Sequence, residues 1–347
     1  MHYFEISYVT TLPKDGNAPR LTINGTTHKK YRVIFSENVN NREYILSSGI
    51  CETNQTIISN ARQWYTNWVI RVYDGDELVF FDLFNPKDKT IFIKIDAFAL
   101  GDNIAWLPYV EEFRRKHNCH VICSTFYNEL FSKAYPLLMF VKPNTTIENI
   151  YSQYYIGASN DGNKIYSPIN SNEHPLQFVA SRILGLADIE LKPELNNVFR
   201  FGNNKLYDKY VTLSEFGSSD IKEWKAEGGW QSVVNTLNDY GYKVIVISKE
   251  PTNLVGVIDD TGDKSLLDRC RTMLHADFHL GVSSGLSWLA WGLGKHVFMI
   301  SDVTPPWHEF ISDITRLGGE ELTSVNYSVE TQTKKEKAIE KLIEILY

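Results

Sequence analysis

Short apolar runs separated by turn-forming clusters fill residues 1–90. The runs YRVIF, WVIRVY and ELVFF are rich in β-branched and aromatic residues, and clusters such as Asn24-Gly25 lie between them. Runs of this composition bounded by Gly and Asn are typical of β-strands. We therefore expect residues 1–90 to form a β-rich N-terminal extension.

From residue 91 the pattern alternates between strands and helices. Apolar residues recur at helical spacing between Asn103 and about His117, which predicts a helix with one buried face. Residues 143–172 are rich in Asn, Ser and Tyr and are expected to be a loop that faces a substrate. Further strands are predicted at IFIKIDAF, VICST and LLMFVK, and further helices at FYNELFSKAY and HPLQFVASRILGL. Together these elements predict a domain over residues 91–195.

The second half repeats the alternation. Strands are predicted at KYVTLSEF, YKVIVIS, DFHLGVSS and HVFMIS, with helices at GWQSVVNTLNDYG and LLDRCRTMLHA. Alternation of this kind produces right-handed crossovers on a parallel sheet. We predict an α/β fold with two Rossmann-like domains, residues 91–195 and 196–330, that face a ligand cleft. A C-terminal helix is expected over residues 331–347.

An anion-binding turn is predicted within GVSSGLSWLAWGLGKHVFMI, residues 281–300. Ser283, Ser284 and Gly285 open an apolar helix in this stretch. The backbone N–H groups of a first helical turn have no intrahelical partner, and the helix dipole is positive there. The turn therefore suits a phosphate or diphosphate, although a purely structural turn can have the same sequence.

A carboxylate is predicted at the corresponding place in the first domain. Asp102 follows the strand IFIKIDAF within Leu100-Gly101-Asp102-Asn103, and Gly101 allows a tight turn there. Such a carboxylate can act as a general base for a hydroxyl group. It can also cap the helix that follows, and the two roles can coexist. We expect Gly101, Asn103 and Trp106 to lie on the acceptor side of the cleft.

A lysine and two serines follow the first strand of the second domain, in SEFGSSDIKEWKAEGGW. Ser218 and Ser219 can donate hydrogen bonds to phosphate oxygens, and Lys222 can neutralise the charge of a diphosphate. Lys225 is the competing candidate, and the stretch can also be an ordinary exposed segment.

The segment SDVTPPWHEF follows the last predicted strand and is placed to surround a nucleoside. Its two prolines stiffen the backbone and present Trp307, His308 and Glu309 in fixed positions. We assign Trp307 and Glu309 to the donor side of the cleft.

Charge and composition narrow the function classes. The net charge of −7 argues against a duplex nucleic-acid partner. No apolar run reaches the roughly 18 residues that a membrane span needs, and residues 1–16 lack the pattern of a secretory signal, so we expect a cytoplasmic protein.

Two candidate metal motifs have simpler explanations. In HNCHVIC, a strand would place Cys119 and Cys123 on one face and His120 on the other, which favours a structural core. Asp74-Gly75-Asp76 matches the Asp-x-Asp triplet that binds a metal in one class of glycosyltransferases. Asp-Gly between apolar runs is also a strong hairpin signal, and we favour the hairpin.

Taken together, these stretches resemble the bacterial autotransporter heptosyltransferases. These are GT-B enzymes, related to the lipopolysaccharide-core heptosyltransferases, that add heptose from an ADP-sugar to protein serines. The similar stretches, within residues 1–310, are LGDNIAWLPYVEEFRRKHNCHVIC, HPLQFVASRILGL, KEW with GGW, and GVSSGLSWLAWGLGKHVFMIS followed by PPWHEF.

The resemblance implies a role for several residues. It makes Asp102 the general base, Lys222 the lysine that holds the donor phosphates, and Ser283, Ser284 and Gly285 the diphosphate turn. Family members work without a divalent cation, so no cofactor is expected besides the nucleotide-sugar substrate. The family continues into a cysteine-bearing segment that holds an iron ion, whereas residues 311–347 contain no cysteine. This departure leaves the iron, the associated assembly and the protein acceptor open.

We therefore expect an inverting, metal-independent glycosyltransferase that moves a heptose-like sugar from a nucleoside-diphosphate donor, ADP-linked by the resemblance, to an acceptor hydroxyl. The expected acceptor is a protein. The alternatives are a glycan or a hydroxymethylated DNA base as acceptor, and a non-catalytic scaffold of the same fold. A homo-oligomer is compatible with the sequence.

Overall fold

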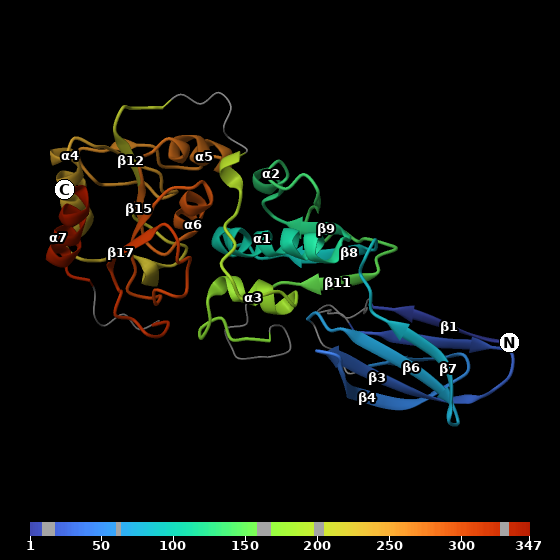
Figure 1. The fold of residues 1–347 in the computed structure, drawn as a ribbon. Helices are drawn as coiled ribbons and strands as arrows, with labels where there is room; N and C mark the ends of the chain where they lie inside the picture. The colour runs from blue at the N-terminus through green and yellow to red at the C-terminus, as the bar shows by residue number, and fades with distance from the viewer. Residues whose placement is uncertain (9–17, 60–63, 158–167, 198–204, 327–332) are drawn as a thin grey trace.

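The computed structural model describes residues 1–8, 18–59, 64–157, 168–197, 205–326 and 333–347 (Figure 1). The predicted β-rich extension is present as two antiparallel sheets. One has the order β1 (His2–Ser7), β2 (Arg20–Gly25), β5 (Gln55–Ile58), and the other β4 (Arg42–Glu52), β3 (Lys30–Val39), β6 (Trp68–Asp74), β7 (Glu77–Leu83). Buried residues of both sheets form one core, which includes Leu21, Ile23, Val33, Trp68 and Ile70.

The Asp74-Gly75-Asp76 triplet is the predicted hairpin. Asp74 pairs with Glu77 across the turn between β6 and β7. Gly75 has a positive φ of 57°, a conformation that glycine adopts without steric cost. The Asp74 carboxylate forms an ion pair with Lys29 at the protein surface.

The first Rossmann-like domain is a four-stranded parallel sheet in the order β10-β9-β8-β11. Its strands are β8 (Thr90–Ile95), β9 (His120–Thr125), β10 (Met139–Val141) and β11 (Ser152–Tyr155), and its helices are α1 (Leu100–His117), α2 (Asn128–Phe131) and α3 (Leu176–Ile183). Cys119 and Cys123 are buried beside this sheet and His120 is exposed, as expected for a structural core.

The second Rossmann-like domain has six parallel strands in the order β14-β13-β12-β15-β16-β17. The strands are β12 (Tyr210–Ser214), β13 (Lys243–Val246), β14 (Ile258–Asp259), β15 (His279–Gly281), β16 (Val297–Ile300) and β17 (Ile314–Gly318). The helices are α4 (Gly229–Asp239), α5 (Leu266–Leu274), α6 (Gly285–Gly292) and α7 (Lys335–Leu346), with the 3-10 turns η1 (Leu195–Asn197) and η2 (Asp220–Lys222). Because the strand order reverses between β12 and β15, a crevice opens at their carboxyl ends, where ligands of such folds bind.

Several elements differ from the expectation. The segment FYNELFSKAY forms only the short helix α2, and the expected loop over 143–172 contains the strand β11. The strands β14 and β17 were not predicted. Helix α1 begins at Leu100, so Asp102 lies inside its first turn instead of before the helix. Among the described helices, none is long and apolar enough to span a membrane.

The two Rossmann-like domains meet where the N-terminal ends of α1 and α6 pack together near the centre of the molecule (Figure 1). Glycines make this close approach possible. A Cβ at Gly101 would lie 2.9 Å from Cδ1 of Trp288, and a Cβ at Gly285 would lie 2.9 Å from Cβ of Leu100. Both helix N-termini are therefore brought to the same point between the domains.

Candidate active site

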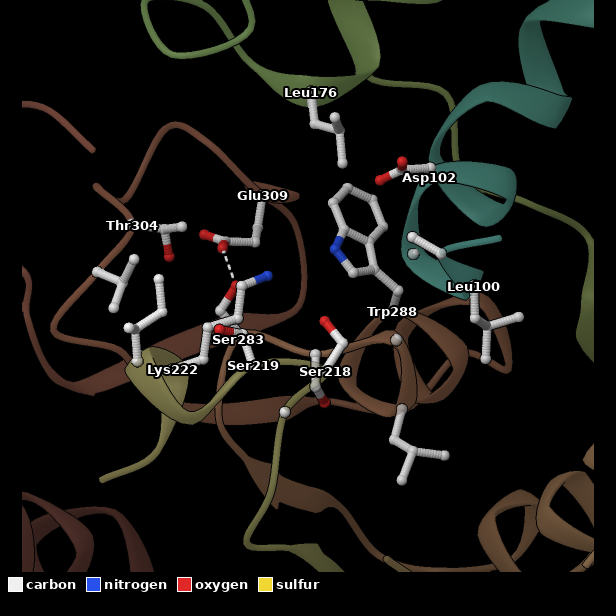
Figure 2. A pocket seen from close by; sticks show the side chains of 18 of the residues that line it. Leu100, Asp102, Leu176, Ser218, Ser219, Lys222, Ser283, Trp288, Thr304 and Glu309 are labelled. Atoms are coloured by element: carbon white, nitrogen blue, oxygen red, sulfur yellow. Dashed lines mark hydrogen bonds between the residues drawn. The ribbon is translucent and has the colours of Figure 1, made fainter. Parts of the chain in front are cut away.

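A cavity of about 620 Å³ lies at this point between the two domains. Its walls come from the start of α1, the loop after β12, the start of α6 and the loop after β16 (Figure 2). Most residues that the sequence suggested for the site line it, namely Gly101, Asp102, Ser218, Ser219, Lys222, Ser283, Ser284, Gly285 and Glu309. One cavity thus brings together the predicted groups of both domains.

Asp102 presents a carboxylate without a hydrogen-bond partner among the described residues. The cap residue of α1 is Ala99, and no side chain caps this helix, so Asp102 does not act as its N-cap. Burial raises the pKa of Asp102 to about 6, and the positive charge of Lys222 partly opposes this shift. A carboxylate with this pKa accepts a proton readily near neutral pH, which suits a general base.

Asn103 and Trp106 lie beneath the cavity and do not line it. The Asn103 side chain donates to the backbone oxygens of Ala97 (2.8 Å) and Ala99 (2.9 Å), and its Oδ1 accepts a hydrogen bond from Thr125. Trp106 donates from Nε1 to the backbone oxygen of Leu176 at 2.8 Å. Asn103 therefore fixes the loop that leads into α1, and Trp106 fixes the position of Leu176 in the cavity wall.

Lys222 brings a positive charge to the cavity from the second domain. It lines the cavity at the end of η2, whereas Lys225 is exposed and is not among the lining residues. No ion pair of the described residues involves Lys222. A Cβ at Gly217 would lie 3.0 Å from Cβ of Lys222, so the loop packs closely against this lysine. Figure 2 shows Lys222 and Asp102 reaching the cavity from the second and first domain respectively.

The two serines of the anion turn have different roles. Oγ of Ser284 caps α6 by accepting a hydrogen bond from the backbone N–H of Ser287 at 3.4 Å, and its own proton stays available for a ligand. Oγ of Ser283 already donates to Oε1 of Glu309 at 2.6 Å (Figure 2). A phosphate at this turn would therefore be bound by backbone N–H groups and by Ser284, while Ser283 holds Glu309.

Glu309 is buried and forms an ion pair with the buried Arg316. Although burial alone would raise it, the pKa of Glu309 lies below its usual value because of Arg316, His308 and hydrogen bonds from Ser283 and Thr304. Arg316 also donates to the backbone oxygens of Thr304 (2.8 Å) and Pro305 (3.1 Å). The pair thus fixes the loop after β16 against the anion turn.

Trp307 does not line the cavity, but its neighbour His308 does. The ring of Trp307 packs against the ring of His308, with centroids 6.0 Å apart. Nδ1 of His308 is buried and has no hydrogen-bond partner in the described structure. Burial lowers the pKa of His308, and Lys222 and Arg316 add to this effect against the opposing charge of Glu309. A neutral imidazole therefore faces the cavity.

The site also contains residues that we did not predict. Ser248, Lys249 and Glu250 line the cavity in the loop that follows β13. This strand was predicted as YKVIVIS, so the rule that ligands bind beyond the carboxyl ends of strands could have identified the loop. Trp288 also stands in the cavity wall, where it packs edge-on against Phe310.

A buried histidine lies at the centre of the second parallel sheet. His279 bridges the neighbouring strands β12 and β15, with Nδ1 3.0 Å from Oγ1 of Thr212 and Nε2 3.2 Å from Oγ of Ser214. Burial lowers the pKa of His279 to about 3, so the ring is neutral at ordinary pH. Nothing in the sequence pattern distinguished this histidine from an ordinary strand residue.

Comparisons with known proteins agree with this architecture. No protein-family model matches the chain. The autotransporter heptosyltransferase Aah of Escherichia coli is 32% identical over 274 residues, which cover 75% of this chain and 69% of Aah. The inactive autotransporter heptosyltransferase BimC of Burkholderia thailandensis is 27% identical over 266 residues, which cover 73% of this chain and 62% of BimC.

A solved structure shares the whole fold. TibC of enterotoxigenic E. coli H10407, described as a dodecameric, iron-containing glycosyltransferase, superposes with a TM-score of 0.82 at 21% sequence identity. The match covers 99% of this chain and 95% of TibC. A second TibC structure, in complex with ADP-D-β-D-heptose, gives a TM-score of 0.81.

Proposed function

The chain belongs to the autotransporter heptosyltransferase family, and we propose that it transfers a heptose from an ADP-linked donor to an acceptor hydroxyl. Its fold is the GT-B fold of glycosyltransferases. One observation carries the proposal: the unpartnered carboxylate of Asp102 and the unpaired ammonium of Lys222 line the same cavity from opposite domains.

The donor half of the reaction needs positive charge where the diphosphate leaves. We assign this task to Lys222, the N–H groups at the start of α6 and the hydroxyl of Ser284. Ser218 and Ser219, in the same wall, can donate further hydrogen bonds. These groups supply the charge stabilisation that a divalent cation supplies in other enzymes, so we propose a metal-independent reaction.

The acceptor half of the reaction needs a base. As the acceptor oxygen attacks the anomeric carbon, Asp102 takes the hydroxyl proton and the bond from this carbon to the diphosphate oxygen breaks. The electron pair of that bond leaves with ADP. Because the base and the diphosphate groups belong to opposite domains, we propose attack from the face opposite the leaving group, which inverts the anomeric centre.

The iron of TibC has no counterpart in this proposal. Residues 311–347 contain no cysteine. Within the described ranges, no group of three or more His, Cys, Asp or Glu side chains could hold a metal ion. The residues that the structure describes therefore do not fit an iron site, and no step of the mechanism involves one.

The proposed acceptor is a protein hydroxyl. A glycan or a hydroxymethylated DNA base is the alternative acceptor. A non-catalytic scaffold is the alternative function, because the relative BimC is described as inactive. The alternative acceptors all use the same nucleotide-sugar donor, whereas a scaffold needs none. The binding of the donor is therefore tested first.

A thermal-shift panel of ADP, UDP, GDP, TDP and their sugars tests the donor. A ligand that binds only the native state at about 100 times its Kd stabilises a protein by roughly 2.7 kcal/mol. We expect ADP and ADP-heptose to raise the Tm. A preference for another nucleotide would refute the ADP-linked donor, and no response to any member of the panel would favour the scaffold.

A further inference from the structure

His308 links the loop after β16 to the first Rossmann-like domain. Its backbone oxygen accepts a hydrogen bond from the backbone N–H of Leu176 at 3.0 Å. The backbone oxygen of Leu176 in turn accepts one from Nε1 of Trp106, which lies about one helical turn after Asp102 in α1. Leu176 and Asp102 both line the cavity (Figure 2). His308 is therefore held in a fixed place relative to the helix that carries Asp102.

The same loop is tied to the anion turn. Glu309, the next residue along the chain, accepts the hydrogen bond from Ser283 at 2.6 Å and pairs with Arg316. The backbone N–H of His308 donates to the backbone oxygen of Pro305 at 3.0 Å, and Arg316 donates to the same oxygen at 3.1 Å. His308 thus lies between the anion turn and the wall of the first domain.

The imidazole of His308 has an unused hydrogen-bonding position at the cavity. Neither ring nitrogen has a hydrogen-bond partner among the described residues, and Nδ1 is closed to solvent whereas Nε2 is accessible. His308 lines the cavity, so Nε2 is the ring nitrogen that a ligand can reach. Burial lowers the pKa of His308 and keeps the ring neutral, and a neutral imidazole nitrogen pairs with a hydroxyl group without adding charge.

The proposed reaction fixes which part of the donor lies here. The diphosphate binds at the anion turn and Lys222, and the acceptor hydroxyl lies beside Asp102, so the transferred sugar occupies the space between them. The charge of Lys222 acts on the titration of both Asp102 and His308. These three side chains therefore surround the same part of the cavity.

We propose that His308 is a specificity-determining residue for the donor sugar, and that its Nε2 forms a hydrogen bond with a sugar hydroxyl. This inference rests on the proposed function, because it takes the diphosphate and the acceptor hydroxyl to lie where that function places them. A sugar hydroxyl both donates and accepts, so it matches a neutral imidazole. ADP without the sugar makes no such contact, so His308 affects the binding of the nucleotide sugar and not that of ADP.

The test compares two ligands that differ chiefly by the sugar. Calorimetric titration without acceptor gives the Kd of ADP and of ADP-heptose, and the ratio of the two isolates the contribution of the sugar. The variants are His308→Leu, which removes both ring nitrogens, and His308→Gln, whose amide nitrogen replaces Nε2. His296→Gln is the matched control, because His296 precedes β16 at the opposite end of the strand, bonds Thr315 through Nε2 at 2.9 Å and does not line the cavity.

We expect His308→Leu to weaken ADP-heptose binding by about three- to tenfold, the loss of one neutral hydrogen bond, and to keep ADP binding within about twofold of the wild type. His308→Gln should bind ADP-heptose more tightly than His308→Leu, since the amide restores the bond. His296→Gln should match the wild type with both ligands. Retained ADP binding also shows that each variant is folded.

Two results would overturn the role of His308. One is an unchanged ratio of the two Kd values in His308→Leu. The other is an equal loss of ADP and ADP-heptose binding, which would mean that His308 only supports the loop. In either case a wild type that binds ADP-heptose leaves the proposed function standing, whereas a wild type that binds neither ligand would overturn the proposed donor and this inference with it.

Discussion

At the residue scale, the central feature is the contrast between Asp102 and the charged groups around it. Glu309 is neutralised by Arg316 and by hydrogen bonds, whereas Asp102 has neither an ion pair nor a hydrogen bond among the described residues. Its raised pKa therefore reflects burial that the charge of Lys222 offsets only in part. Carboxylates in clefts whose burial is only partly offset mark functional sites, because a ligand supplies the missing partner.

The pKa of Asp102 predicts a pH dependence of transfer. Only the deprotonated carboxylate can accept the hydroxyl proton, so kcat/KM should fall about tenfold per pH unit below pH 6 and level off above it. Initial rates measured between pH 5 and 8 check this, with donor affinity followed over the same range. A limb centred far from pH 6 would assign the base to another group.

Lys222 and Lys225 provide a matched pair for the donor side. A charge-assisted hydrogen bond contributes roughly 1.5–3 kcal/mol, so Lys222→Ala should weaken ADP binding by about 10- to 100-fold. Lys225→Ala should leave ADP affinity unchanged, because Lys225 does not line the cavity. Calorimetric titration of both variants is the measurement. Equal effects would show that the lysines act through the general charge of the surface.

At the element scale, the site depends on the packing of two helix N-termini. Gly285 is the first residue of α6, and a Cβ there would lie 2.9 Å from Cβ of Leu100 and 3.4 Å from the backbone nitrogen of Gly101. Neither neighbour is the end of a flexible side chain. The anion turn and the first turn of α1, which carries Asp102, can therefore approach each other only with glycine at this position.

This packing predicts the effect of Gly285→Ala. Overpacking of such a contact costs about 1–3 kcal/mol, and the displaced helix should also bind ADP more weakly. Gly229→Ala is the control, because Gly229 begins α4 and its Cβ would lie 2.7 Å from Cη2 of Trp224, away from the cavity. The control should lose stability in thermal denaturation but keep its ADP affinity. Retained ADP affinity in Gly285→Ala would contradict this account.

The sequence predicted those secondary-structure elements and turns that depend on the local pattern of apolar and polar residues. Most of the longer strands and helices follow from their apolar patterns, although α1 is buried on all sides over residues 103–110 and presents no single apolar face. The anion turn and Asp102 follow from their place after strands. The two-residue strand β14 has no period to detect. The link from Ser283 through Glu309 to Arg316 depends on tertiary packing, since Arg316 belongs to the unpredicted strand β17.

At the scale of the whole molecule, the partly buried His117 and the fully buried His279 make the native state sensitive to acid. His117 stacks on Tyr65 where the N-terminal extension meets the first Rossmann-like domain, with ring centroids 5.0 Å apart. Burial lowers the pKa of His117 to about 4, and that of His279 to about 3. Both are neutral in the native state and take up a proton on unfolding below their ordinary value of 6.5.

The sign of this linkage predicts acid destabilisation. The stabilisation is fully present above pH 6.5 and is lost as the pH falls toward 4, by about 1.4 kcal/mol per pH unit for each histidine. In urea unfolding, His117→Phe should reduce the pH dependence of the unfolding free energy by the contribution of one histidine. His120→Ala changes an exposed histidine and should leave it unaltered. An unchanged slope in His117→Phe would rule out His117 as a source of acid sensitivity.

The most direct test of the whole account is ADP release from ADP-heptose with a protein acceptor, compared between the wild type and Asp102→Asn. The wild type should release ADP in step with the heptose incorporated. Asp102→Asn should be slower by about 100-fold or more, as expected for loss of a general base, while its ADP affinity stays within about twofold. Equal rates for the two proteins, or no ADP release by a correctly folded wild type, would contradict the proposed mechanism.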